Sequence, residues 1–390
     1  MTPRNRWLEL LLIGVARIAM GVQFQAVGAL GPLLVGTLVA DWTALGTLIG
    51  AYSLAGVAVA LPAGWLLARF GDRRILLAGL GLMALGGLVL ALAPDFGLAL
   101  VGRLVAGSGS ALLTIACAKR VLDRFAGPAL APAMGVMLSA WPIGIAAALL
   151  LMPLAGDAWR TGLLGSAALC ALALPLLAWA VPAGPRGAVQ PMARLRRGEW
   201  AGLLAVGALW SSYNAAYAVL LGFAPAFLVA RGASAAEAGA VASLVGWAIL
   251  PLLPLGGALA ERLGRPLLVC ALCIAGLALA LLALVAGAAA APLLILVGLL
   301  AGPPASLIMA FLGRVLSPAS RPFGVGIHYM MFYGGLAVLP PLAGLLRDLT
   351  GAPAAPVLAA AGFLGLALLA LAALALSLRA AAAAPAPRPR

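Results

Sequence analysis

Charged and polar side chains inside long apolar runs are the residues of this sequence best placed to do chemistry. Arg17 lies in the first run, ten residues after Trp7, and Gly21 and Gln25 follow it at i+4 and i+8. In a helix these positions share one face, and Arg17 lies about 15 Å along the axis from Trp7. A guanidinium at mid-membrane costs about 2.5–3.5 kcal/mol, so its presence predicts a functional role.

A second polar stripe occurs in the run that begins near residue 200. Trp210, Tyr213, Asn214 and Tyr217 are spaced i, i+3, i+4 and i+7, on one face of an otherwise apolar helix. We predict that this face and the Arg17 face bind the substrate from two sides. The alternative is that the arginine and the aromatic residues only brace helix packing.

Five further residues complete the predicted substrate site. Arg103 lies about 9 Å from the end of its run, where it either reaches the membrane surface or faces a cavity. His328 is the only histidine, and it either carries a proton between pH 5 and 8 or is a packed core residue. The five residues are Arg103, Trp141, His328, Tyr329 and Tyr333.

No acidic residue lies at the middle of an apolar run, because all ten Asp and Glu residues fall in connections or near the ends of runs. A cation exporter usually needs a mid-membrane carboxylate, both to hold its substrate and to exchange protons. Arg17 therefore lacks a resident counter-ion. We predict that the substrate itself neutralises it, which indicates a small anionic solute.

The sequence gives no indication of an enzyme. It has no pairing of a nucleophile with a base, no cluster of metal ligands and no phosphate-binding loop. Cys270 and Cys273 form a C-x-x-C without nearby His or acidic residues, so we interpret them, like Cys117 and Cys170, as apolar filler. We expect no metal and no cofactor, with coupling to protons left open.

The composition indicates that lipid is the solvent for most of the chain. Hydrophobic residues make up 65% of the 390 residues and charged residues 9%, with a mean hydropathy of +1.16. A soluble domain is nearer half apolar and a quarter charged. The net charge of +14 does not predict nucleic-acid binding, because most of the basic residues fall in short gaps between apolar runs.

About 20 apolar residues cross a bilayer, and on that rule the chain contains twelve spans. Nineteen Arg and Lys residues fall on one set of connections and three on the other, which predicts that both termini are cytoplasmic in a plasma (inner) membrane protein. The predicted spans are 8–37, 44–67, 75–93, 97–118, 132–153, 161–181, 200–229, 237–259, 266–288, 291–312, 323–346 and 354–378.

The chain divides into two related halves. We predict an N-terminal six-helix bundle (1–181), a cytoplasmic linker (182–199), a C-terminal six-helix bundle (200–379) and a disordered tail (380–390). The halves align at an offset of 193, which pairs Pro32 with Pro225 and Gly46 with Gly239. Two repeats that flank a central site are a transporter architecture.

The connection after the second run is repeated in the second half. The first copy contains Gly64, Arg69, Gly71, Asp72 and Arg73, and the second contains Gly257, Glu261, Arg262, Gly264 and Arg265. The second glycine of each copy can take a positive φ to turn the chain, and the arginines hold the loop on the cytoplasmic side. We predict that these loops have a gating role; the alternative is simple anchoring by positive charge.

These loops resemble the signature G-x-L-a-D-r-x-G-r-k of the major facilitator superfamily, and Arg103-Leu-Val-Ala-Gly107 resembles its helix 4 pattern. The resemblance implies an all-α membrane protein of twelve helices in two pseudo-symmetric bundles, which works by alternating access. In the family the loop acid braces one half against the other. Ala68 stands at that position here, and whether Asp72 replaces the acid is open.

Several functions remain open within this resemblance. The charge pattern is weakly similar to that of the cyanate and nitrate porters, in agreement with an anionic solute. Ala140-Trp141-Pro142-Ile143-Gly144 partly resembles an antiporter motif, so a proton-coupled drug or metabolite exporter is the alternative. A non-transporting membrane sensor is a third reading. We expect a monomer whose partners are a small solute and the lipid bilayer, without nucleic acid.

Overall fold

The computed structural model describes residues 6–60, 62–182, 195–253, 255–256 and 262–383 of the chain. Regular structure in these ranges is helical, apart from an isolated bridge between Val35 and Val39. The first half contains α1 (Arg6–Ala29), α2 (Gly31–Leu34), α3 (Trp42–Ala60), α4 (Ala63–Phe70), α5 (Asp72–Leu92), α6 (Phe96–Arg124), η1 (Gly127–Ala129), α7 (Leu130–Leu151), η2 (Met152–Ala158) and α8 (Trp159–Ala180). The second contains α9 (Arg197–Val229), α10 (Ala235–Ala248), α12 (Pro266–Val285), α13 (Ala290–Val315), α14 (Arg321–Thr350) and α15 (Ala355–Ala383).

The helices are long and apolar enough for a multi-pass membrane protein. In the described part of the chain, ten helical stretches meet the length and hydropathy needed to cross a bilayer. One of these stretches, Pro132–Ala180, contains both α7 and α8, and α10 is shorter than a full span. The membrane prediction is therefore confirmed, whereas the number twelve remains a prediction.

Several boundaries differ from the sequence expectation. α9 begins at Arg197, inside the predicted linker, and α15 continues to Ala383, inside the predicted tail. The predicted span 237–259 corresponds to α10, which ends at Ala248 and is followed by turns at 249–251. Pro251 is the last residue of these turns. Because it has no backbone N–H, it cannot continue the helical hydrogen bonds.

Two glycines turn the chain where the repeated loops require it. Gly71 joins α4 to α5 with φ +80°, and Gly264 precedes α12 with φ +62°. A residue with a Cβ would be strained at these angles. The positive φ expected of both glycines is confirmed.

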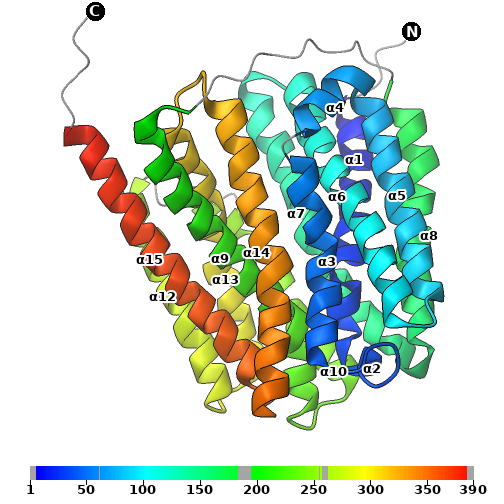
Figure 1. The fold of residues 1–390 in the computed structure, drawn as a ribbon. Helices are drawn as coiled ribbons and strands as arrows, with labels where there is room; N and C mark the ends of the chain where they lie inside the picture. Colours follow the sequence, from blue (N-terminus) through cyan, green and yellow to red (C-terminus); the bar gives the residue numbers. More distant parts are fainter. Residues whose placement is uncertain (1–5, 61, 183–194, 254, 257–261, 384–390) are drawn as a thin grey trace, which may run out of the picture.

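Figure 1 shows a bundle of roughly parallel and antiparallel helices, with the start of α1 and the end of α15 at the same end. We call this end the terminal face; the end that carries α2 is the opposite face. Most helices pack mainly within their own half, whereas α3 and α14 pack mainly on each other across the boundary. The halves meet where α3 lies beside α14, α7 beside α10 and α1 beside α9.

The halves approach closely because glycines line their contacts. A Cβ on Gly46 would overlap the carbonyl oxygen of Pro340, and a Cβ on Gly50 would overlap that of Ala337. Gly344 of α14 packs in the same way against the backbone of Trp42. Small residues permit such backbone contact between helices in lipid, where packing rather than the hydrophobic effect drives association.

We predict opposite stability effects for two Gly→Ala variants. Gly50→Ala should lower the unfolding free energy by roughly 1–3 kcal/mol, because the added Cβ overlaps Ala337 across the α3–α14 contact. Gly81→Ala, whose Cβ would meet no atom within 4 Å, should raise it by up to about 1 kcal/mol through helix propensity. Thermal unfolding of both proteins in detergent measures the difference; equal shifts would contradict the α3–α14 packing.

Candidate solute site and interhelical contacts

Arg17 of α1 is buried at the middle of its helix, with 6% of its surface exposed. Its Nη1 donates to Oγ1 of Thr114 on α6 over 3.4 Å, which is a long hydrogen bond. Its Nε has no hydrogen-bond partner among the described residues. Tyr329 and Tyr333 of α14, which belong to the other half of the molecule, lie near it. Arg17 thus lies at the boundary of the two halves.

No carboxylate among the described residues pairs with Arg17. Glu9, Asp72 and Asp123 form ion pairs with other cations near the terminal face. Asp157 is exposed. Five further acids bind backbone or hydroxyl groups: Asp41, Asp95, Glu199, Glu237 and Asp348. Glu261, the remaining acid, lies outside the described residues. The absence of a mid-membrane acid therefore holds for the described structure.

An aromatic cluster lies beside Arg17 on the second half, and we call it the aromatic wall: Trp210, His328, Tyr329, Phe332 and Tyr333. Trp210 of α9 stacks on His328 and Phe332 of α14, with ring centroids 6.1 and 6.0 Å apart. Phe332 contacts Tyr333 at 5.0 Å and Tyr329 at 6.1 Å. The rings form one continuous aromatic cluster.

Three nitrogens of this wall lack hydrogen bonds. Both ring nitrogens of His328 and Nε1 of Trp210 are buried and have no partner among the described residues. His328 is 0% exposed. These nitrogens therefore keep unused hydrogen-bonding capacity within the wall.

Two site residues were not found by sequence reasoning. Phe332 lies at i+4 from His328 and i+3 from Tyr329, so helical spacing alone could have identified it. Thr114 carries no such signal, because its contact with Arg17 depends on how α1 packs against α6. Its hydroxyl also donates to the Ser110 carbonyl, 2.9 Å away, as serine and threonine commonly do in membrane helices.

The predicted companions of Arg17 on α1 face different partners. Gly21 packs against the backbone of α7 at Trp141 and Gly144, where a Cβ would not fit. Gln25 reaches across the boundary, and its amide nitrogen donates to the Leu221 carbonyl of α9 over 2.8 Å. Gly21 and Gln25 thus hold α1 against its neighbours, and their roles in solute binding remain predictions.

The stripe on α9 divides in the same way. The hydroxyl of Tyr213 donates to the Ala301 carbonyl of α13, and Tyr213 and Tyr217 line a small apolar recess within the second half. The amide of Asn214 donates to the carbonyl of Trp210 on its own helix, over 2.8 Å. Trp210 is the member of the stripe that joins the aromatic wall. The solute contacts predicted for the other three stay predictions.

Arg103 of α6 is fully buried, with 0% of its surface exposed. Its nitrogens donate to the carbonyls of Leu48, Gln23 and Phe24 over 2.8, 2.9 and 3.2 Å. Its guanidinium also lies 4.4 Å from the ring centre of Tyr52. The side chain therefore ties α6 to α1 and α3. Trp141 lies nearby and contacts Phe24, with ring centroids 5.3 Å apart.

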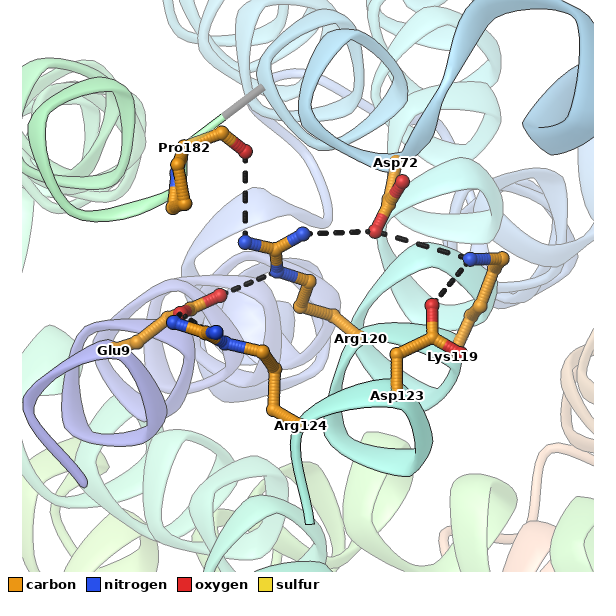
Figure 2. A network of polar contacts seen from close by, with 7 residues as sticks. All are labelled: Glu9, Asp72, Lys119, Arg120, Asp123, Arg124 and Pro182. Atoms are coloured by element: carbon orange, nitrogen blue, oxygen red, sulfur yellow. Dashed lines mark hydrogen bonds and ion pairs between the residues drawn. The ribbon is translucent and has the colours of Figure 1, made fainter. Parts of the chain in front are cut away.

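Figure 2 shows an ion network at the terminal face of the first half. Glu9 of α1 binds Arg120 and Arg124 of α6, the latter over 2.8 Å. Asp72 accepts from Arg120 Nη1 over 3.1 Å and lies 3.9 Å from the Lys119 ammonium. Nη2 of Arg120 donates to the carbonyl of Pro182 over 3.5 Å. The network joins α1, α5 and α6 to Pro182, two residues after the end of α8.

The second half has a related contact at the same face. Glu199, near the start of α9, accepts from the backbone N–H of Ser317 over 2.8 Å and from the Ser320 hydroxyl over 2.7 Å. In each half, therefore, a glutamate near the start of the first helix contacts the region where the fourth span ends. In the first half these partners are at the end of the fourth span, and in the second half they lie between the fourth and fifth spans. This repeats the internal symmetry with neutral partners in place of arginines.

The loop residues predicted to gate the protein lie near this face. Arg69 is exposed over the rings of Trp65 and Phe70, and Arg73 donates to the Ala178 carbonyl over 2.9 Å. The charged partners of Asp72 come from α6, in its own half. Gly64 lies in α4, and Arg262 and Arg265 are exposed near Gly264. Gly257 and Glu261 lie outside the described residues, so the gating roles remain predictions.

At the opposite face, Asp348 of α14 joins the two halves. Its carboxylate accepts from the backbone N–H groups of Trp42 and Thr43 over 3.1 and 2.7 Å, and from the Thr43 hydroxyl over 2.6 Å. The guanidinium of Arg347 lies 3.3 Å from the ring centre of Trp42. Asp348 thus satisfies the free N–H groups at the start of α3, where a negative charge is also favoured by the helix dipole.

The described residues do not contain a group of three or more His, Cys, Asp or Glu side chains that could hold a metal. The arrangement instead offers a cationic group, a hydroxyl and an aromatic surface at the boundary of two halves. These groups can bind and orient a small molecule.

Comparison with known proteins gives consistent results. The family model described as Major Facilitator Superfamily matches residues 13–230 and 205–390. An uncharacterized MFS-type transporter of Mycobacterium tuberculosis is 29% identical over 188 residues, 47% of this chain and 32% of that protein. A solute carrier family 2, facilitated glucose transporter of Mus musculus is 31% identical over 150 residues, covering 37% of this chain and 27% of that protein. A multidrug resistance protein B homolog of Mycobacterium tuberculosis is 34% identical over 120 residues, 27% of this chain and 21% of that protein. The matches thus span a third or less of these relatives.

We predict that Glu9→Gln destabilises the first half, because it removes the carboxylate that compensates Arg120 and Arg124. Breaking a buried ion pair costs roughly 3–5 kcal/mol, and Arg124 is only partly buried, so the lower end is expected. Asp157→Asn, at an exposed position, should change the unfolding free energy by less than about 0.5 kcal/mol. Thermal unfolding in detergent compares the two; an unchanged Glu9→Gln protein would show that the network adds no stability.

Proposed function

The chain belongs to the major facilitator superfamily, and from that premise we propose that it is a secondary active transporter that carries a small anionic solute by alternating access. The superfamily is a family of transporters rather than enzymes, in agreement with the sequence expectation. The proposal concerns the solute, its site and the movement of the two halves.

The observation that supports an anionic solute is the state of Arg17. The guanidinium is buried, makes one long hydrogen bond, leaves Nε unbonded and faces no described carboxylate. An uncompensated charge at this depth is costly, and the cost falls when an anion binds. A carboxylate or similar anion can accept two charge-assisted hydrogen bonds from one guanidinium. The solute is therefore the counter-ion of Arg17.

Alternating access requires that contacts between the halves form on one face and break on the other. The contacts of Asp348 with α3 and of Gly46 and Gly50 with α14 lie between mid-depth and the opposite face. We propose that they close the solute site on that face and separate when the site opens there. The repeated loops would close the terminal face when the site opens at the opposite face.

The orientation follows from the distribution of charge. Nineteen Arg and Lys residues fall in one set of connections in the sequence and three in the other, and the larger set includes described residues at the starts of α1, α5 and α9. The positive-inside rule then places the terminal face in the cytoplasm of a plasma (inner) membrane protein. In that orientation, the proposed closing contacts of Asp348, Gly46 and Gly50 face the outside.

A proton-coupled exporter of drugs or metabolites is the second candidate. It is favoured by the 34% identity over 120 residues to a protein named as a multidrug resistance homolog. His328, buried among aromatic rings, would then be the proton carrier. Extrusion of lipophilic cations by cells that express the chain, with loss in a His328→Asn variant, would favour this candidate over anion transport.

We predict that Arg17→Gln abolishes anion transport, because no other described cation lies at that position to take over the charge. Arg17→Lys should retain part of it, since an ammonium keeps the charge but loses the planar pair of donors. Uptake of permanently charged anions such as nitrate and alkyl sulfonates into proteoliposomes measures the effect. The exposed Arg314 provides the control Arg314→Gln, which should transport like the unaltered protein. Equal uptake by the unaltered protein and Arg17→Gln would reject the proposal.

We predict that Asp348→Ala favours opening at the opposite face, because the N–H groups at the start of α3 lose their acceptor. Ile49 reports this opening, since its side chain is buried at the boundary and contacts Gly222 of α9. In a background in which the four free cysteines are replaced, a maleimide should label the thiol of Ile49→Cys several-fold faster with Asp348→Ala. Asp95→Ala is the control, because Asp95 caps α6 within the first half. Similar labelling rates in both backgrounds would exclude Asp348 as a closing contact.

A further inference from the structure

The aromatic wall presents ring surface at the boundary of the two halves. Trp210, Tyr329 and Phe332 are partly exposed, whereas His328 and Tyr333 are buried behind them. The stacked and edge contacts between the rings, with centroids 5.0–6.1 Å apart, hold the exposed rings in place. The wall is therefore a fixed aromatic surface that is partly exposed at Trp210, Tyr329 and Phe332.

This surface lies close to Arg17. Tyr329 and Tyr333 are near the Arg17 guanidinium, and Tyr333 is also near the Thr114 hydroxyl, which accepts from Arg17 over 3.4 Å. Tyr329 and Phe332 pack near Ala60 of α3 and Ala111 of α6, so the wall faces the half of the molecule that carries Arg17. A solute whose charged group binds Arg17 thus has the rest of its structure next to the rings.

The two parts of the site favour different parts of one molecule. A guanidinium pairs best with a planar carboxylate, which accepts two hydrogen bonds. Aromatic side chains bind another ring by offset or edge-to-face stacking, beyond what the buried area contributes. A small inorganic anion would use the first part and leave the second without a contact.

We propose that the solute is an aromatic carboxylate, with its carboxylate at Arg17 and its ring against Phe332 and Trp210. This inference rests on the proposed anion transport and narrows it to a substrate class. Phe332 and Trp210 are then specificity-determining residues, since they distinguish a ring from an aliphatic group of similar size.

Binding of benzoate and cyclohexanecarboxylate to the purified full chain in detergent tests the proposal. The two anions match in charge and are close in size, but only benzoate has a π face. Titration calorimetry should give a Kd for benzoate that is roughly 2- to 10-fold lower. Phe332→Leu should bring the two Kd values together, mainly by weakening benzoate. Phe363→Leu, which changes a ring of α15 outside the wall, should keep the preference.

The outcomes separate this inference from the proposed function. Equal Kd values for both anions in the unaltered chain, or a benzoate preference that persists in both Phe332→Leu and Trp210→Leu, would overturn the ring contact. Trp210→Leu serves as the second variant if Phe332→Leu does not fold. If both carboxylates bind equally and both are lost in Arg17→Gln, the anion site stands and only the aromatic class fails. If benzyl alcohol binds as tightly as benzoate, the anion proposal fails while the ring preference remains measurable.

Discussion

A guanidinium inside a membrane protein must be neutralised or hydrogen-bonded within the protein, because lipid offers no partner, and this constraint organises the structure around three arginines. Arg103 donates to three helix carbonyls, and Arg120 lies between the carboxylates of Glu9 and Asp72. Arg17 has only the distant Thr114 hydroxyl. The first two contribute to the packing of the first half, whereas the third is left with capacity to bind something else.

The sequence could indicate that Arg17 and Arg103 are buried, but not that their hydrogen-bond partners differ. Both lie in apolar runs and both break the hydropathy pattern in the same way. Arg103 finds its acceptors because α6 crosses α1 and α3 where their carbonyls of Gln23, Phe24 and Leu48 are directed towards it. Such acceptors belong to the backbone and leave no signal in residue type. Helix crossing, rather than composition, decides which buried arginine is structural.

The fold was more predictable than the site, for a physical reason. Span length and hydropathy depend on local composition, and the positive φ of Gly71 and Gly264 follows from a repeated glycine in a repeated loop. Side-chain direction on α9 depends on the neighbours instead. The same i, i+3, i+4, i+7 stripe sends Tyr213 and Tyr217 towards α12 and α13 and Trp210 towards α14. Helical spacing gives a shared face, and tertiary packing then divides it between two surroundings.

The kinds of contact within and between the halves also differ, in agreement with the proposed movement of the halves. The ion pairs of the described residues join helices of the first half, where Glu9 and Arg120 link α1 to α6. Across the boundary, the contacts are glycine-to-backbone packing, the Gln25 amide on Leu221 and the Asp348 carboxylate on α3. These contacts fix the two halves against each other in the described arrangement. If the boundary opened as proposed, each would leave a group that water can solvate. Separating a buried ion pair would cost several kcal/mol, so contacts of the observed kinds agree better with the proposed alternating access.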